Sequence, residues 1–260
     1  NTIWQGVEKL AGHSKWANRV HRKTRQDSKR SRLFAKLSRA ITVAARQGGG
    51  DPESNPRLRT FIEKAKTAEM PADNIEYAIK RGLGEIEGVQ FEEVLYEAYG
   101  PGGVALLISC LTDNNQRTVA EVRNLLKKRD GTMSGAGSVT WMFEQKGVIT
   151  VPKNAVDEET LFLTAAEAGA EDVLDEDDEV YEVRTAMADL HKVSQALREA
   201  GIPIERDELV MIPSSTVTVP DEVAGKLLSL LDSLEEHDDV QQVFGNFELS
   251  DEALEAHYKE

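Results

Sequence analysis

The distribution of charge along the chain is the feature that most constrains this sequence. Residues 11–46 contain eleven Lys or Arg and one acidic residue, Asp27, in a chain of net charge −15. Residues 1–90 carry +8 and residues 91–260 carry −23. A basic block on an acidic chain can attract a polyanion while the remainder repels it. We therefore predict a basic head that binds a phosphate backbone with steep salt dependence. A merely solvated helix face is the alternative, but such a face would mix the two signs.

The composition sets the class of protein. A chain of 260 residues that is 40% hydrophobic can bury a real core and form two or three domains. No apolar run approaches the roughly 20 residues that span a bilayer, so we expect no membrane contact. The lone cysteine, Cys110, excludes an intramolecular disulfide and lies in an apolar run, residues 104–111, that is typical of a buried strand. Residues 1–10 lack a secretory signal and are interpreted as an extension or a cloning remnant.

The head is predicted to be helical after residue 26. Residues 12–26 show no apolar periodicity and are expected to form an extended or mobile arm. A helix capped by Asp27 or Ser28 should run to Gln47. At 100° per residue, four basic side chains fall on one arc of that helix: Lys29, Arg32, Lys36 and Arg39. Two more helices are predicted at 56–66, begun by Asn55-Pro56, and at 72–81.

The acidic remainder alternates strands with amphipathic helices, which favours α+β sandwich domains of the split β-α-β type. Hairpins are predicted at 91–111, turning at 100–103, and at 138–151, turning at 145–147. The remaining helices and strands are expected in this order: a helix that contains Val119, Val122, Leu125 and Leu126 and ends at Asp130-Gly131, a helix over 157–168, a strand over 180–184, a helix over 189–200, strands over 202–205 and 209–219, a helix over 221–234 and a strand over 240–249.

Patterns for enzymatic chemistry are missing from the sequence. No Gly-Lys-Ser/Thr phosphate loop occurs, and the five histidines have no metal-ligand spacing. The acidic stretch 171–179 lacks the glycine of a calcium loop and is expected to be solvated, with a weak cation site or a basic protein partner as the alternative. Residues 135–137 and 100–103 can present backbone N–H groups to a phosphate or serve as turns. We predict no enzyme, no cofactor and no metal site.

Seven motifs in one order resemble the YebC/PmpR family over nearly all of residues 11–260. They are Gly12-His13-Ser14-Lys15-Trp16, His21-Arg22-Lys23, Gly48-Gly49-Gly50 with Asn55-Pro56-Arg57-Leu58-Arg59, Met70-Pro71 with Asn74-Ile75, Tyr96-Glu97 with Tyr99-Gly100-Pro101-Gly102-Gly103, Thr112-Asp113-Asn114 with Arg117-Thr118, and Asp239-Val240-Gln241 with Val243 and Asn246.

The resemblance implies an N-terminal helical domain and two α/β domains, the third inserted into the second. Mapped here, these are residues 11–88, residues 89–138 with 214–249, and residues 139–213, followed by a tail over 250–260. The family's members are described as ribosome-associated translational activators, one of them mitochondrial, and as DNA-binding transcriptional regulators.

We therefore predict a regulator of gene expression that grips RNA on the ribosome (rRNA or tRNA), with duplex-DNA binding as the alternative. A protein-interaction scaffold built on the acidic domains is the second alternative. We expect a monomer in the bacterial cytoplasm rather than in a mitochondrial matrix. The nucleic-acid-binding residues are predicted to be Lys15, Trp16, His21, Arg22, Lys23, Arg25, Lys29, Arg32, Lys36, Arg39, Arg57 and Arg59. Trp16 is expected either to stack on an unpaired base or to plug the helical bundle. A second candidate site is the loop Tyr99, Gly100, Pro101, Gly102 and Gly103.

Overall fold

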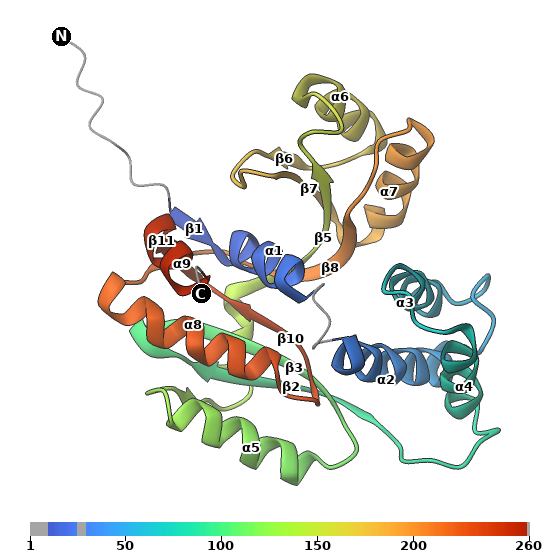
Figure 1. Ribbon diagram of the computed structural model, residues 1–260, viewed down its shortest axis with the longest axis horizontal. Helices are drawn as coiled ribbons and strands as arrows, with labels where there is room; N and C mark the ends of the chain where they lie inside the picture. Colours follow the sequence, from blue (N-terminus) through green and yellow to red (C-terminus); the bar gives the residue numbers. More distant parts are fainter. Residues whose placement is uncertain (1–9, 25–29, 259–260) are drawn as a thin grey trace.

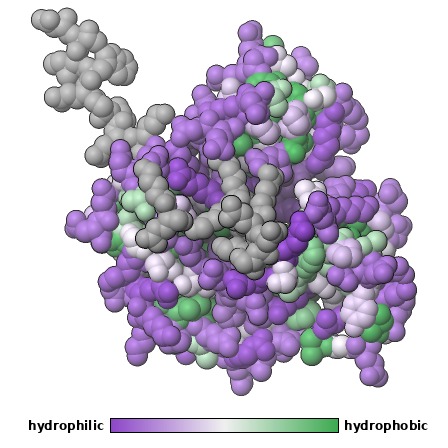
Figure 2. Space-filling model, viewed as in Figure 1, coloured by the Kyte–Doolittle hydropathy of each residue, from purple (hydrophilic) through white to green (hydrophobic). Residues whose placement is uncertain are grey.

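The computed structural model describes residues 10–24 and 30–258, and its elements form a helical head and a larger mixed α/β body (Figure 1). Hydrophilic residues dominate the face drawn in Figure 2, where apolar residues gather only in small patches. No helix in the described ranges is both long and apolar enough to span a bilayer.

The head is a bundle of three helices. Its core includes Ile41, Leu58 and Ala78, all fully buried. Asn55 begins the second helix as predicted, because its side-chain oxygen accepts a hydrogen bond from the Leu58 N–H at 3.0 Å. The helices are α2 (Arg30–Gly48), α3 (Pro56–Thr67) and α4 (Ala72–Gly82).

The first sheet of the body joins segments that are far apart in the sequence. Its strand order is β10-β3-β2-β4, so the hairpin of β2 and β3 is extended by a strand from near the C-terminus. Helices α5 and α8 cover one face of this sheet (Figure 1). The elements are β2 (Glu92–Tyr99), the 3-10 turn η2 (Pro101–Gly103), β3 (Ala105–Thr112), α5 (Asn115–Lys127), β4 (Thr132–Met133), α8 (Asp221–Glu235) and β10 (Val240–Gly245).

The second sheet of the body is built from residues 143–213 alone, with strand order β6-β7-β5-β8 and antiparallel pairing throughout. Its core includes Ile149, Val183 and Leu197. Its elements are the 3-10 turn η3 (Thr140–Met142), β5 (Phe143–Pro152), α6 (Glu158–Ala168), β6 (Asp172–Leu174), β7 (Val180–Ala186), the 3-10 turn η4 (Met187–Asp189), α7 (Leu190–Glu199) and β8 (Arg206–Pro213).

The hairpin predicted at 138–151 is wrong, because residues 143–152 form the single strand β5. Gly147 lies inside this strand, paired with both β7 and β8. A Cβ atom at Gly147 would lie 2.2 Å from the Thr185 hydroxyl, so glycine serves close packing here and not a turn. The strand predicted at 202–205 is likewise wrong, because these residues form no strand; the strand predicted at 209–219 corresponds to β8, which begins at Arg206 and ends at Pro213, and to residues 217–218.

Both ends of the described chain pack against the first sheet's core. A small sheet of order β1-β11-β9 joins them, made of β1 (Leu10–Gly12), β9 (Val217–Thr218) and β11 (Phe247–Ser250). The arm predicted over 12–26 is instead largely helical, as α1 (His13–Thr24), and most of the predicted tail forms α9 (Asp251–Tyr258). Ala17 and Val20 pack with Trp16 against the core that contains Phe247. A short helix over these residues is thus stabilised by tertiary contact.

The fold class is the predicted one, a helical domain followed by two α/β domains. The sheet that spans 143–213 interrupts the segments that make the first sheet, and on this ground we propose the domain limits given above. One physical adjustment follows from the packing: α1 shares the core of the body, so the head proper consists of α2, α3 and α4.

A buried carboxylate ties the glycine-rich loop 134–140 to β2. Glu97 is 6% exposed, and its two oxygens accept hydrogen bonds from the backbone N–H groups of Gly137 (2.5 Å), Val139 (2.6 Å) and Thr140 (3.0 Å). Burial alone would raise its pKa, but these donors prevail and lower the pKa of Glu97 from 4.5 to about 2. The loop that offered N–H groups to a phosphate therefore already binds an anion of its own chain.

Replacing this carboxylate tests its contribution. Glu97→Gln leaves one N–H donor without a good acceptor, so we expect a loss of about 1–3 kcal/mol in the free energy of unfolding at pH 7. The folded-state pKa is depressed, so this stabilisation is complete above pH 4.5 and disappears as the pH falls toward about 2. Denaturant unfolding of both proteins between pH 7 and pH 3 should show the difference shrinking. A constant difference would contradict the ionic role.

Candidate nucleic-acid interface

The two predicted contact residues at the start of α1 are structural. Trp16 is 2% exposed, its indole N–H donates to the Tyr258 hydroxyl at 3.0 Å, and its ring meets Phe247 edge-on with centroids 6.0 Å apart. Lys15 is buried and lies 2.8 Å from Asp251 and 3.4 Å from Asp178. Trp16 therefore packs in the core of the body. It does not pack in the helical bundle, and its burial leaves no ring face open to stack on a base.

The rest of the predicted arm is only partly described. His21, Arg22 and Lys23 lie on the last turns of α1, and their side chains fall outside the described part, as do Arg25 and Lys29 entirely. Their roles stay predictions.

Removing the indole should lower the stability of the fold rather than remove a nucleic-acid contact. We expect Trp16→Ala to lower the free energy of unfolding by about 3–5 kcal/mol, because it leaves a cavity and removes the N–H that bonds the Tyr258 hydroxyl, which keeps only its own bond to Asp232 among those described. Trp16→Phe refills most of the volume and should cost less than half of that. Thermal melting of the two variants checks the order. An unchanged melting temperature for Trp16→Ala, with nucleic-acid binding lost, would restore the stacking role.

The predicted basic arc of α2 lies against the acidic end of α8 and the turn that follows it. Lys36 Nζ donates to the Glu235 carbonyl at 2.7 Å and lies 3.8 Å from the Glu235 carboxylate. Arg32 lies 3.8 Å from the carboxylate of Glu236, the residue after α8. Three basic side chains on one side of α2 therefore face oxygen atoms of residues roughly 200 positions later in the chain: Arg32, Lys36 and Arg39.

Burial shapes the Lys36–Glu235 pair. Removal from water lowers the pKa of Lys36 and raises the pKa of Glu235, while their mutual attraction opposes both changes. Glu235 is further held by the Val243 N–H at 3.1 Å. A pair of this kind contributes little net stability, yet leaving one member alone is costly.

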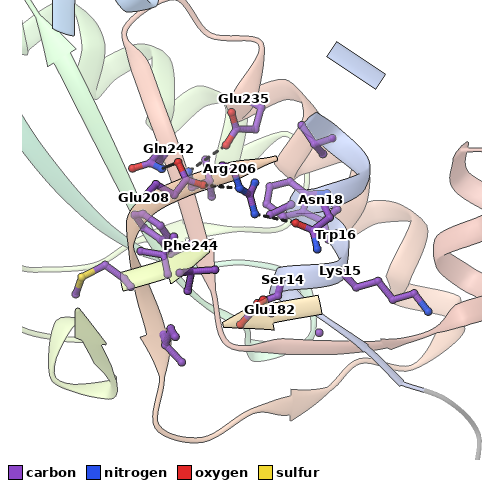
Figure 3. A pocket seen from close by; sticks show the side chains of 18 of the residues that line it. Ser14, Lys15, Trp16, Asn18, Glu182, Arg206, Glu208, Glu235, Gln242 and Phe244 are labelled. Carbon is purple, nitrogen blue, oxygen red and sulfur yellow. Dashed lines mark hydrogen bonds and ion pairs between the residues drawn. The ribbon is translucent and has the colours of Figure 1, made fainter. Parts of the chain in front are cut away.

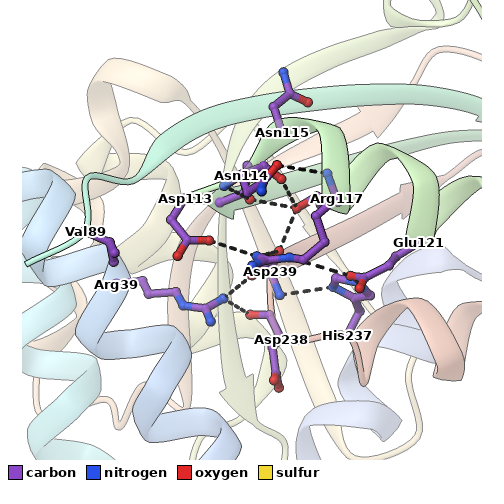
Figure 4. Close-up of polar contacts among 12 residues, drawn as sticks. Arg39, Val89, Asp113, Asn114, Asn115, Arg117, Glu121, His237, Asp238 and Asp239 are labelled. Carbon is purple, nitrogen blue, oxygen red and sulfur yellow. Dashed lines mark hydrogen bonds and ion pairs between the residues drawn. The ribbon is translucent and has the colours of Figure 1, made fainter.

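Asp239 is the junction of a second polar network (Figure 4). Its carboxylate accepts from Arg39 (2.7 Å), Arg117 (2.6 Å) and the Thr118 hydroxyl (2.6 Å). Burial raises the pKa of Asp239, but these three donors outweigh it and hold the pKa below its ordinary value. Asp239 thereby ties the head, through Arg39, to the start of α5. Arg39 also donates to the Asp238 carbonyl.

Three side chains of this network stand close enough to share a cation. Glu121, His237 and Asp239 each offer a ligand atom within 4.8 Å of one another. The Asp239 N–H donates to His237 Nδ1 at 3.1 Å, so His237 Nε2 carries the proton that it shares with Glu121 at 2.8 Å. The guanidinium groups of Arg39 and Arg117 already form ion pairs with the Asp239 carboxylate, so the cluster serves as an ion-pair junction.

The predicted residues of α3 form no ion pair with the described residues of α8. Arg57 is exposed and bonds Gln47 at 2.6 Å, with a further contact to Glu93 of the body. Arg59 is partly exposed, and no ion pair with another described residue is seen for it. The Arg57 side chain, at 45% exposure, is thus more accessible than those of Lys36 (14%) and Arg39 (21%).

A cavity of about 450 Å³ lies where the three parts of the chain meet (Figure 3). Arg206 of β8 crosses it and donates to the Asn18 amide oxygen at 2.7 Å, beside Glu208 at 3.1 Å. Glu208 also lies 2.9 Å from Lys64 of α3 and accepts from Gln242 at 3.3 Å. These residues could not be predicted from the sequence. Alternate positions on a strand share one face of the sheet, but the pattern does not show which other segment packs against that face.

The second candidate site, Tyr99 to Gly103, forms the turn between β2 and β3. Pro101 is buried, Gly102 and Gly103 have φ of +76° and +77°, and a Cβ atom at Gly102 would lie 3.5 Å from Val219. Left-handed backbone favours glycine, so the hairpin itself accounts for both residues. Tyr99 remains 36% exposed.

The comparisons with known proteins cover both the head and the body. The family models described as "TACO1/YebC protein N-terminal domain" and "TACO1/YebC second and third domain" match residues 14–85 and 91–247. Proteins named "probable transcriptional regulatory protein" from Persephonella marina and Geobacter sulfurreducens are 57% and 52% identical, each over 95% of this chain and 99% of its own length.

A solved structure agrees with these matches. The crystal structure of a conserved hypothetical protein from Aquifex aeolicus is 50% identical, covers 86% of this chain and 93% of its own, and superposes with a TM-score of 0.81. A helical domain followed by two α/β domains is the architecture shared with these proteins, and the chain belongs to the TACO1/YebC family.

Proposed function

We propose that this protein is a non-enzymatic regulator of gene expression that binds a nucleic-acid backbone through its helical head and acts as a translational activator on the ribosome. One observation carries the proposal: Arg32, Lys36 and Arg39 stand in a row on α2 and each faces an oxygen atom, charged or carbonyl. A row of cations that holds carboxylates is also suited to hold phosphates.

The surroundings of this row favour RNA over duplex DNA as the target. A helix that reads the major groove must present an open face to base edges. Lys36 of α2 instead lies against α8 and Arg39 against the turn after it, while Arg57 on the neighbouring helix α3 is exposed and Arg59 is partly exposed. An irregular RNA surface can be met by such a divided set of cations.

Transcriptional regulation through DNA is the second candidate, and the names of the relatives favour it. The two candidates predict different competitors for the same head. Mixed-sequence duplex DNA should leave a ribosome-bound protein in place at about 0.15 M salt, but should displace a duplex-binding protein.

Neutralising the arc tests the proposal. We expect Arg32→Gln, Lys36→Gln and Arg39→Gln together to abolish co-sedimentation with ribosomes at about 0.15 M salt and to flatten the dependence of log K on log salt by about 2–3. The matched control removes three exposed cations of the body: Lys127→Gln, Lys128→Gln and Lys192→Gln.

The control separates local contact from bulk charge, since both variants change the net charge equally. Equal losses in the two variants would contradict a binding role for α2. Displacement of the wild-type protein from ribosomes by duplex DNA would instead favour the transcriptional candidate. Thermal melting of each variant verifies that the bundle is folded.

A further inference from the structure

The contact between the head and the body depends heavily on charge. Five ion pairs between described residues cross it, four of them with nitrogen–oxygen distances between 2.7 and 3.8 Å. These four are Arg32–Glu236, Lys36–Glu235, Arg39–Asp239 and Lys64–Glu208, and the fifth is Arg57–Glu93. In every pair the head supplies the cation and the body supplies the anion.

The apolar part of the contact is small by comparison. Ala40 and Val43 of α2 meet Phe91 and Leu111 at the edge of the first sheet, with Phe61 packed beside them. Arg39 adds its guanidinium over the Phe91 ring, 5.4 Å from the centroid. Charge pairs weaken with salt and exchange partners easily, whereas an apolar core does neither.

The connection from α4 to β2 is suited to a hinge. Residues 83–90 are exposed apart from Ile86, which is half-buried, and they include Gly84 with φ of +78° and Gly88. Segments with few buried contacts open at low free-energy cost. A swing of the head about this connection would open the ion pairs and the cluster of Ala40, Val43, Phe91 and Leu111, but it would leave the strand pairing of both sheets in place.

We propose that the acidic end of α8, Glu235 and Glu236, is an intramolecular competitor for the polyanion, and that it keeps the basic side of α2 closed until phosphates displace it. This inference rests on the proposed function and adds its regulation. Phosphates carry the same charge as the carboxylates and bind the same cations, so ligand binding and closure exclude one another on α2. The apparent dissociation constant then equals that of the open form divided by the fraction of molecules that are open.

Removing the competitor should tighten binding. We expect Glu235→Gln with Glu236→Gln to lower the dissociation constant for a 20-nucleotide single-stranded RNA about tenfold, which corresponds to a wild-type protein that is open about one tenth of the time. Gln at position 235 can still accept the Val243 N–H, so the fold around β10 is retained. Fluorescence anisotropy at about 0.15 M salt measures the change.

The control must separate closure from a general loss of negative charge. Glu159→Gln with Glu167→Gln changes the net charge equally on exposed positions of α6, which is part of the other sheet's layer. We expect less than a twofold change for this pair. Small-angle scattering of the Glu235→Gln, Glu236→Gln variant without RNA should show an increased radius of gyration, and the Glu159→Gln, Glu167→Gln variant should not.

The outcomes distinguish the two proposals. Equal affinity gains in the two variants would overturn the closure while leaving nucleic-acid binding intact. No binding by the wild-type protein or by either variant, even at about 0.05 M salt, would overturn the proposed function and the closure with it. The same anisotropy measurement with a duplex DNA of the same sequence, run in parallel, shows which nucleic acid the opened head binds more tightly.

Discussion

The attraction between the basic side of α2 and the acidic end of α8 is the interaction on which the arrangement of head and body depends. It joins residues 36 and 235, which only the fold brings together, and it explains how a strongly basic segment sits on a strongly acidic chain. Each charge is partly removed from water, so each needs its partner. The same requirement makes the contact exchangeable, because another anion can take the partner's place. The equilibrium between the closed and the open arrangement of head and body therefore sets how accessible the basic side of α2 is.

Asp239 and Glu97 are carboxylates that the body holds in place with several donors. Asp239 binds Arg39 of the head while Thr118 and Arg117 hold it from α5, so the anion that contacts the head is also fixed within the body. Glu97 does the same for the loop before β5 by collecting three backbone N–H groups. Both carboxylates have a lowered pKa because several donors converge on them. At Gly137, where the sequence suggested a backbone contact with a phosphate, the N–H group thus bonds the carboxylate of Glu97.

Local signals predicted most of the fold, and contacts distant in sequence escaped prediction. The Asn55-Pro56 helix start and the hairpin at Gly100 depend on a few neighbouring residues, and both were confirmed. Gly147 was mistaken for a turn because its role is to let Thr185 of a neighbouring strand approach. For the candidate site, spacing along α2 predicted that Arg32, Lys36 and Arg39 share one side of the helix. It could not predict that α8 covers that side, nor that Trp16 belongs to the core, because periodicity names a face and never its partner.

The central claim is that closure of the head and binding of a polyanion compete for the same cations, and the distance between head and body tests it most directly. Fluorophores on cysteines introduced at the exposed positions Tyr77 of α4 and Glu222 of α8 report that distance by energy transfer. The native Cys110 is fully buried and its pKa is raised to about 12, so it does not compete for label. The account predicts that single-stranded RNA lengthens the distance and that the loss of transfer follows the binding curve. Saturated binding with unchanged transfer would show that the head binds while closed, and would contradict the account.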